Sequence, residues 1–125
     1  MGKRYLLDTN IVIDFLGNKL PAKKKKHLSS IVDSEINLSV INKIELLGFS
    51  KVDQEIINFV GFSTIFPLDE LIVDKTIEIR SLYYIKLPDA IIAATALYHN
   101  LILVTRNTKD FRKVDGLSVE NPYDL

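Results

Sequence analysis

The sequence predicts an α/β fold in a single domain spanning residues 1–125, with a parallel sheet of about five strands flanked by helices. Short apolar runs rich in branched residues alternate with longer stretches of helical period, which is typical of a parallel sheet covered by helices. The chain has 125 residues, 47% of them hydrophobic, which suits one compact core and is too short for two domains. It contains no cysteine, so neither a disulfide framework nor a thiolate metal site supports the fold.

Five short apolar segments are the expected strands. The segment 101–105 is the most clearly buried of them, because all but its last residue are large and aliphatic. The segment 64–68 contains Pro67, a residue that favours a sheet edge or a strand end. The expected strands are residues 4–7, 36–40, 64–68, 101–105 and 117–120.

Polar residues and prolines mark the expected helix starts. The run Asp8-Thr9-Asn10 can cap the helix that follows the first strand, and Pro88 suits the first turn of a helix rich in small alanines. The expected helices are residues 11–16, a segment opened by Pro21, and residues 42–47, 52–59, 69–84 and 88–98.

Carboxylates follow several of the expected strands. Asp8 comes directly after the first strand, Glu45 lies a few residues past the second, and Asp89 is in the first turn of a helix. Asn107 and Asp110 come just after the strand at 101–105. In an open parallel sheet, ligands bind outside the carboxyl ends of the strands. We therefore expect three or four carboxylates to share one pocket if the sheet order brings these ends together.

Such a cluster would raise its own pKa values or need a cation. Two unit charges about 4 Å apart repel by about 4 kcal/mol at an effective dielectric constant near 20. A divalent metal is the simpler resolution, and an all-oxygen ligand set favours Mg²⁺ or Mn²⁺ over zinc. His27 and His99 are isolated in the sequence, and we interpret them as a surface residue and a helix-end residue.

Each carboxylate also has a structural interpretation. Asp8 can cap a helix, Asp89 can sit at a helix N-terminus that favours negative charge, and Asn42 with Glu45 has the spacing of a capping box. A cap does not explain why Asp8 lies between an apolar strand and an apolar helix. Four further aspartates are interpreted as surface or capping residues: Asp14, Asp33, Asp53 and Asp74.

The 16 basic and 16 acidic residues give a net charge of zero, which argues against nucleic-acid binding by bulk positive charge. The first 26 residues nevertheless carry a surplus of about five positive charges, four of them in the run Lys23–Lys26. This run is either a solvated helix face or a surface that tracks phosphates. No apolar stretch reaches the roughly 18 residues of a membrane span, and no secretory signal opens the chain, so we expect a cytoplasmic protein.

Four motifs carry a family resemblance. They are Tyr-Leu-Leu-Asp-Thr-Asn at 5–10, Ser39 followed by Glu45-Leu46, Leu-Pro-Asp-Ala-Ile-Ile-Ala-Ala at 87–94, and Thr-Arg-Asn-Thr-Lys-Asp-Phe at 105–111. In this order and spacing, the chain resembles a PIN domain of the small, VapC-like toxin ribonucleases of toxin–antitoxin modules. One segment departs from the pattern, because Tyr84-Ile85-Lys86 stands where many relatives carry glycine.

The resemblance places the metal-binding acids at Asp8, Glu45 and Asp89, with the fourth position at Asp110 or Asn107. It implies a PIN-like fold with an endoribonuclease activity that depends on Mg²⁺ or Mn²⁺. It also implies a homodimer, silenced by an antitoxin whose tail occupies the site. All four carboxylates, including Asp110, are expected to serve as catalytic and metal-binding residues.

Other polar residues near these acids are candidate substrate contacts. Thr9 and Thr105 match hydroxyl positions of the family, and together with Asn10 they could orient the acids or the scissile phosphate. The basic residues after the last acid could clamp flanking phosphates, or they could simply form an exposed loop. Single-stranded or looped RNA is the expected substrate, because its phosphates are flexible and its bases are free. The candidate substrate-binding residues are Thr9, Asn10, Thr105, Arg106, Asn107 and Lys109.

Two alternatives belong to other functional classes. A receiver-like signalling domain has a similar length and alternating architecture, but Asp8 lacks the acidic neighbour that such a domain needs. A PIN-like domain that only binds a partner is the second alternative, although an unpaired acid cluster argues against it. Exposed apolar residues such as Phe59, Phe62 and Tyr83 would fit self-association, or they would complete the core.

Overall fold

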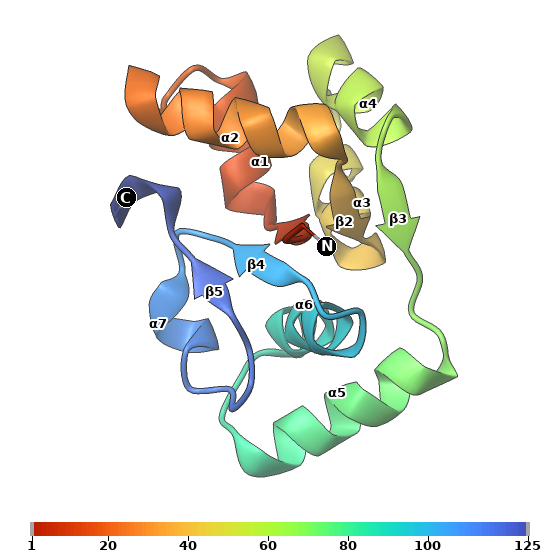
Figure 1. The fold of residues 1–125 in the computed structure, drawn as a ribbon. Coiled ribbons are helices and arrows are strands. Elements are labelled where there is room, and N and C mark those ends of the chain that lie inside the picture. Colours follow the sequence, from red (N-terminus) through yellow and green to blue (C-terminus); the bar gives the residue numbers. More distant parts are fainter. Residues whose placement is uncertain (1, 125) are drawn as a thin grey trace.

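A computed structural model describes residues 2–124 and shows a layered α/β arrangement (Figure 1). The elements follow in the order β1 (Tyr5–Leu7), α1 (Thr9–Leu16), α2 (Ala22–Ser34), β2 (Asn37–Ser39), α3 (Val40–Leu47), α4 (Gln54–Gly61), β3 (Thr64–Phe66), α5 (Glu70–Leu82), α6 (Leu87–Tyr98), β4 (Ile102–Val104), α7 (Thr108–Phe111), β5 (Val119–Glu120) and a 3₁₀-helix (Pro122–Asp124). All five expected strands and all six expected helices are present. No helix within residues 2–124 is long and apolar enough to cross a bilayer.

The strands form two parallel sheets, so the prediction of one sheet of about five strands is corrected. One sheet has the order β1-β4-β5, and the other pairs β2 with β3. The two sheets adjoin where β2 lies beside β1. There the buried Asn37 side chain donates from Nδ2 to the carbonyl oxygen of Tyr5 at 2.9 Å. In a continuous sheet, the Tyr5 carbonyl oxygen would accept from a backbone N–H of β2. Here the Asn37 side chain satisfies it instead.

Capping explains why two helices begin earlier than predicted. Helix α1 begins at Thr9, because the Asp8 carboxylate accepts from the Thr9 backbone N–H at 2.8 Å. Helix α3 begins at Val40, because Ser39 and Asn42 form a reciprocal capping box. The prediction that Asn42 and Glu45 form this box is therefore wrong.

The structure also adds two short elements and trims β3. Strand β3 ends at Phe66, since Pro67 has no backbone N–H with which to continue the ladder. The short helix α7 and the 3₁₀-helix at residues 122–124 have no strong sequence signal, because neither is long enough to show a helical period.

Two apolar clusters cover the opposite faces of the β1-β4-β5 sheet. Leu6 packs with α5 and α6, whereas its neighbour Leu7 packs with α1 to α4, as the alternation of side chains along a strand requires. Fully burying one such leucine stabilises the fold by about 1.5–3 kcal/mol. Helix α6 lies between the sheet and α5 (Figure 1), and its residues 90–96 are all buried. The small alanines of α6 permit this close packing.

The aromatic residues considered for self-association separate in the structure. Phe59 is buried in the cluster formed with α1 to α4, and Tyr83 packs against the other cluster. Phe62 alone of the three is largely exposed. The first two residues therefore complete the core.

Candidate functional site

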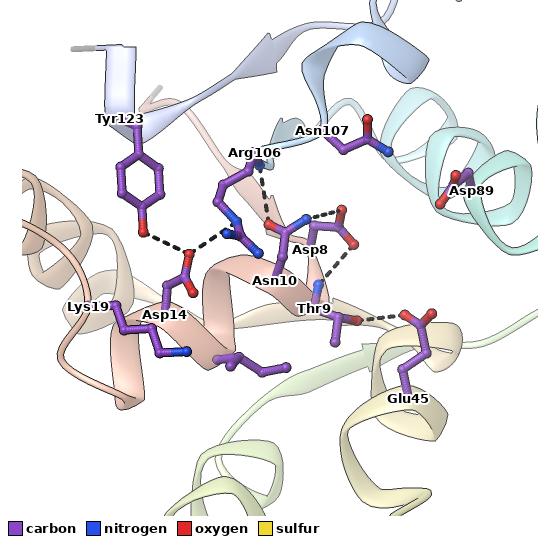
Figure 2. Close-up of a pocket in the computed structure, with 11 residues that line it drawn as sticks. Asp8, Thr9, Asn10, Asp14, Lys19, Glu45, Asp89, Arg106, Asn107 and Tyr123 are labelled. Carbon is purple, nitrogen blue, oxygen red and sulfur yellow. Dashed lines mark hydrogen bonds and ion pairs between the residues drawn. The ribbon is translucent and has the colours of Figure 1, made fainter.

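A cavity of about 430 Å³ opens where β1 and β4 end and α1 begins. Figure 2 shows Asp8 near its centre, with Glu45 and Asp89 approaching from α3 and α6. Three of the four predicted acids thus line one cavity, as the strand-end argument expects. The residues that line it are Asp8, Thr9, Asn10, Ile13, Asp14, Lys19, Glu45, Asp89, Arg106, Asn107 and Tyr123.

Asp8 is the most enclosed of these three acids, with 7% of its surface exposed. Its carboxylate accepts from Thr9 N at 2.8 Å, Thr105 Oγ1 at 2.7 Å, Asn10 Nδ2 at 3.3 Å and Asn42 Nδ2 at 3.4 Å. Burial raises the pKa of Asp8, while the hydrogen bonds from Thr105 and Thr9 act in the opposite direction. These donors fix the orientation of the carboxylate and leave it facing other negative charges.

Thr9 connects Asp8 to Glu45. Its Oγ1 donates to Glu45 Oε1 at 2.6 Å and accepts from Asn42 Nδ2 at 3.1 Å. Because Asn42 is fully buried, this chain of hydrogen bonds holds the Glu45 carboxylate on a rigid support. The charge of Glu45 in turn contributes to the raised pKa of Asp8.

Asp89 lies half-buried in the first turn of α6. Burial raises its pKa most, and the charges of Asp8, Asp110 and Glu45 raise it further. Lys86, at the N-cap of the same helix, acts in the opposite direction. The four predicted acids therefore influence one another electrostatically, and the site favours a cation or a bound proton.

Asp110 lies behind the cavity wall on α7. Asn107 Nδ2 donates to Asp110 Oδ2 at 2.9 Å, and Asn107 itself lines the cavity. The Asn107 backbone N–H donates to Thr105 Oγ1 at 3.0 Å, which ties this loop to the residue that orients Asp8. Within residues 2–124, no three Asp, Glu or His side chains converge closely enough to form a complete metal cluster.

Asp14 is a functional-site residue that the sequence reasoning missed. It was interpreted as a surface or capping residue, but only 3% of it is exposed. It accepts from Tyr123 Oη at 2.7 Å and forms an ion pair with Arg106 Nε at 3.1 Å (Figure 2). Because α1 begins at Thr9, Asp14 lies four residues after Asn10 and so near the same helix face. That spacing was the available signal.

The other candidate residues divide into two groups. Asn10 belongs to the site, since its side chain donates to Thr105 Oγ1 at 3.3 Å and accepts from Arg106 N at 3.2 Å. Lys109 is exposed on α7 and does not line the cavity, and neither does the run Lys23–Lys26. Lys19, which the sequence did not single out, lines the edge of the cavity beside Asp14.

Neither histidine lies in this cavity. His27 Nε2 lies 3.2 Å from Glu120 Oε1. His99 ends α6 and packs at a tilt against Phe66, with ring centroids 4.3 Å apart. The polar lining therefore consists of acids, amides and hydroxyls, together with two cationic side chains.

The family model of the PIN domain matches residues 5–117. The chain belongs to the PIN domain family. It is 31% identical over 129 residues to Ribonuclease VapC1 of Rickettsia felis, covering 91% of this chain and 92% of the relative. This membership confirms the resemblance carried by the four motifs and excludes the receiver-like alternative.

Solved structures agree with this assignment. One is a toxin–antitoxin complex from Klebsiella pneumoniae, which is 33% identical, has a TM-score of 0.76 and covers 97% of this chain and 99% of the other. Another is FitAcB from Neisseria gonorrhoeae, which is 30% identical, has a TM-score of 0.79 and covers the same shares. The whole chain, including the candidate site, is therefore similar to these proteins in fold.

Proposed function

We propose that the chain is a metal-dependent endoribonuclease and acts as the toxin of a toxin–antitoxin pair. The observation that carries this proposal is the group of three carboxylates, Asp8, Glu45 and Asp89, that line one cavity at the ends of β1 and β4, with Asp110 close enough to raise the pKa of Asp89 further. The similarity to a ribonuclease and to the toxin–antitoxin complex supports the choice of RNA as substrate and of an antitoxin as partner.

The chemistry of the lining suits a hard divalent cation, and the acids would have to draw closer together around the ion than they lie within residues 2–124 of this structure. The cavity is lined by carboxylate, amide and hydroxyl oxygens, and burial raises the pKa of both Asp8 and Asp89. Mg²⁺ or Mn²⁺ prefers such oxygen ligands, and its charge would relieve the repulsion among them. When bound, the ion would supply a water molecule of lowered pKa and neutralise charge on a phosphodiester.

We assign the residues the following parts. Asp8, Glu45 and Asp89 hold the cation, and Asp110 supports it through Asn107. Thr105 and Thr9 orient the acids by the hydrogen bonds described above. A single-stranded segment of RNA reaches the cavity more readily than a duplex, because its phosphates can bend toward one pocket.

Arg106 and Lys19 are placed to contact phosphates at the cavity edge. The Arg106 guanidinium is held by Asp14 and keeps 52% of its side chain exposed, so donors remain free for a ligand.

We further propose that the protein acts in the cytoplasm and that it self-associates as a homodimer. A domain that only binds a partner would need no such acid cluster.

Cleavage of a pool of structured RNAs by the purified protein tests the proposal. The reactions contain Mn²⁺, Mg²⁺ or EDTA, and the Asp89→Asn variant is prepared in parallel. We expect cutting that requires metal and disappears in the variant. Absence of both cleavage and Mn²⁺ binding in the wild-type protein would refute the nuclease assignment and favour a domain that only binds.

A further inference from the structure

A second pocket, of about 240 Å³, lies between the end of α5, the start of α6 and the segment after α7. It is lined by Arg80, Tyr84, Ile85, Lys86, Asp110 and Lys113. Three of these six side chains are cationic and one is aromatic, whereas the neighbouring cavity is mainly acidic. We call it the basic pocket.

The basic pocket adjoins the cavity of the candidate site, which we call the acid cavity. The two are connected through Asp110. This residue lines the basic pocket and accepts a hydrogen bond from Asn107, which lines the acid cavity. Lys86 lines the basic pocket and lies three residues before Asp89 at the start of α6. A polymer bound across Asp89 therefore also reaches the basic pocket.

Tyr84 is held out into solvent by anchored neighbours. With 97% of its surface exposed, it forgoes the stabilisation that burial of an aromatic ring usually brings. On one side Tyr83 Oη accepts from Asp115 N at 3.1 Å, and on the other Ile85 is buried in the core. Lys113 donates to the Tyr84 carbonyl oxygen. The ring is thus presented on a backbone that is fixed before any ligand arrives.

The cations of this pocket keep donors for a ligand, and Lys113 does so beside its hydrogen bond to the Tyr84 carbonyl oxygen. Within residues 2–124, none of Arg80, Lys86 and Lys113 forms an ion pair with a carboxylate, and all three are exposed. The one acid among the lining residues is Asp110. The local surplus of positive charge favours an anion, and phosphate binds such side chains well.

We propose that the basic pocket binds a nucleotide next to the scissile bond of single-stranded RNA. The phosphate lies among Arg80, Lys86 and Lys113, and the base stacks on Tyr84. An exposed ring beside a basic groove is the usual combination for binding single strands, and stacking tolerates any base. This inference rests on the proposed nuclease function, and it names the surface over which the substrate leaves the acid cavity.

Binding of a labelled single-stranded RNA of about ten nucleotides, a typical site size, tests the inference by fluorescence anisotropy. The 125-residue protein is used in EDTA, and a gel confirms that the RNA stays intact. We expect Tyr84→Ala to weaken binding by about 5- to 150-fold, the range found for loss of one stacked base, and Tyr84→Phe to retain it. Lys86→Gln should flatten the slope of log affinity against log salt by about 0.7.

Two variants serve as matched controls. Tyr98→Ala removes another exposed tyrosine, at the opposite end of α6 from Asp89, and Lys51→Gln removes an exposed lysine between α3 and α4. Both should bind RNA within about twofold of the wild-type protein, the expected scale for surface changes away from a site. Circular dichroism confirms that every variant is folded.

The outcomes separate this inference from the proposed function. Metal-dependent cleavage with unchanged RNA binding by Tyr84→Ala would overturn the basic pocket and leave the nuclease assignment intact. Binding that depends on Tyr84, in a protein that neither cleaves RNA nor binds Mn²⁺, would support the pocket and refute the nuclease. Unchanged RNA binding together with a loss of self-association in Tyr84→Ala would assign the ring to a protein interface. A wild-type protein that binds no RNA in EDTA would overturn the basic pocket, and one that also neither cleaves RNA nor binds Mn²⁺ would overturn both proposals.

Discussion

Replacing Asp89 by asparagine should stabilise the folded protein in the absence of metal. Asp89 carries a negative charge beside Asp8, Glu45 and Asp110, and none of the hydrogen bonds described for the site uses its carboxylate. The amide has nearly the same shape as the carboxylate but no charge. The variant therefore loses three repulsions and no identified hydrogen bond.

The expected gain follows from the geometry of the site. Pairs of charges that remain in contact with water interact by about 0.2–1 kcal/mol each, so three repulsions are worth about 1–2 kcal/mol. The dipole of α6 and the nearby charge of Lys86 both favour a negative charge at Asp89, and together they oppose this gain by about 0.5–1 kcal/mol. A net stabilisation of about 1 kcal/mol remains, which raises Tm by roughly 3–6 °C for a domain of this length.

The pH dependence of this gain has a definite sign. Because the folded state raises the pKa of Asp89, it binds more protons than the unfolded state just above the ordinary carboxylate range near pH 4. As the pH rises through this window, Asp89 ionises in the folded wild-type protein and its free energy of unfolding falls. The amide of the variant cannot ionise, so the variant has no such loss. The difference in Tm between the two should therefore be close to zero at about pH 3 and reach its full value by about pH 7.

Thermal unfolding followed by circular dichroism at low ionic strength in EDTA measures this difference. Asp74→Asn is the matched control, because Asp74 is an exposed aspartate of α5 and its removal should change stability by less than about 0.5 kcal/mol. If the variant proves less stable than the wild-type protein at pH 7, Asp89 serves the helix dipole and the repulsion argument fails. Adding Mn²⁺ should reverse the order, because only the wild-type site retains its full ligand set.

Three further changes have distinct expected results. Asp8→Asn should abolish RNA cleavage but, unlike Asp89→Asn, should not raise Tm in EDTA, because the amide cannot accept all four hydrogen bonds of the carboxylate. A gain of several degrees would mean that repulsion outweighs these bonds. Tyr123→Phe should lower the free energy of unfolding in urea by about 1–2 kcal/mol, since it removes one hydrogen-bond donor from buried Asp14. An unchanged free energy of unfolding would show that water replaces the hydroxyl. Asn42→Ala should destabilise the fold by about 2 kcal/mol and lower kcat. It removes the side chain that caps the start of α3 and the hydrogen bond that supports Thr9. A change in Tm with unchanged kcat would show that Asn42 acts only as a cap.

The fold could be predicted well because its elements differ in period. The short aliphatic runs at β1 and β4 and the alanine-rich α6 have patterns that few other structures share. The division into two sheets could not be predicted, since it depends on the Asn37 side chain replacing a backbone bond between β1 and β2. A single sequence does not show which partner an asparagine amide takes.

The acids of the site were predictable for a similar reason. Asp8 follows β1 directly, Asp89 lies in the first turn of α6, and Glu45 lies on α3, the helix that follows β2. Parallel strands bring the elements that follow them to one edge. The ion pair of Asp14 with Arg106 could not be found in this way, because Asp14 lies well inside α1 and not at a strand end. Tyr123, which completes this contact, lies in a 3₁₀-helix too short to leave a pattern.

Two of the bonds that hold the acid cavity join residues that are far apart in the sequence. Thr105 orients Asp8 from 97 positions away, and Tyr123 reaches Asp14 across 109 positions. Strand β1, which leads into Asp8, pairs with β4 and therefore waits for residues 102–104 to emerge from the ribosome. A partly synthesised chain thus has its acids but lacks the contacts that orient them. Translation order alone therefore delays assembly of the site until residues 102–123 have been made.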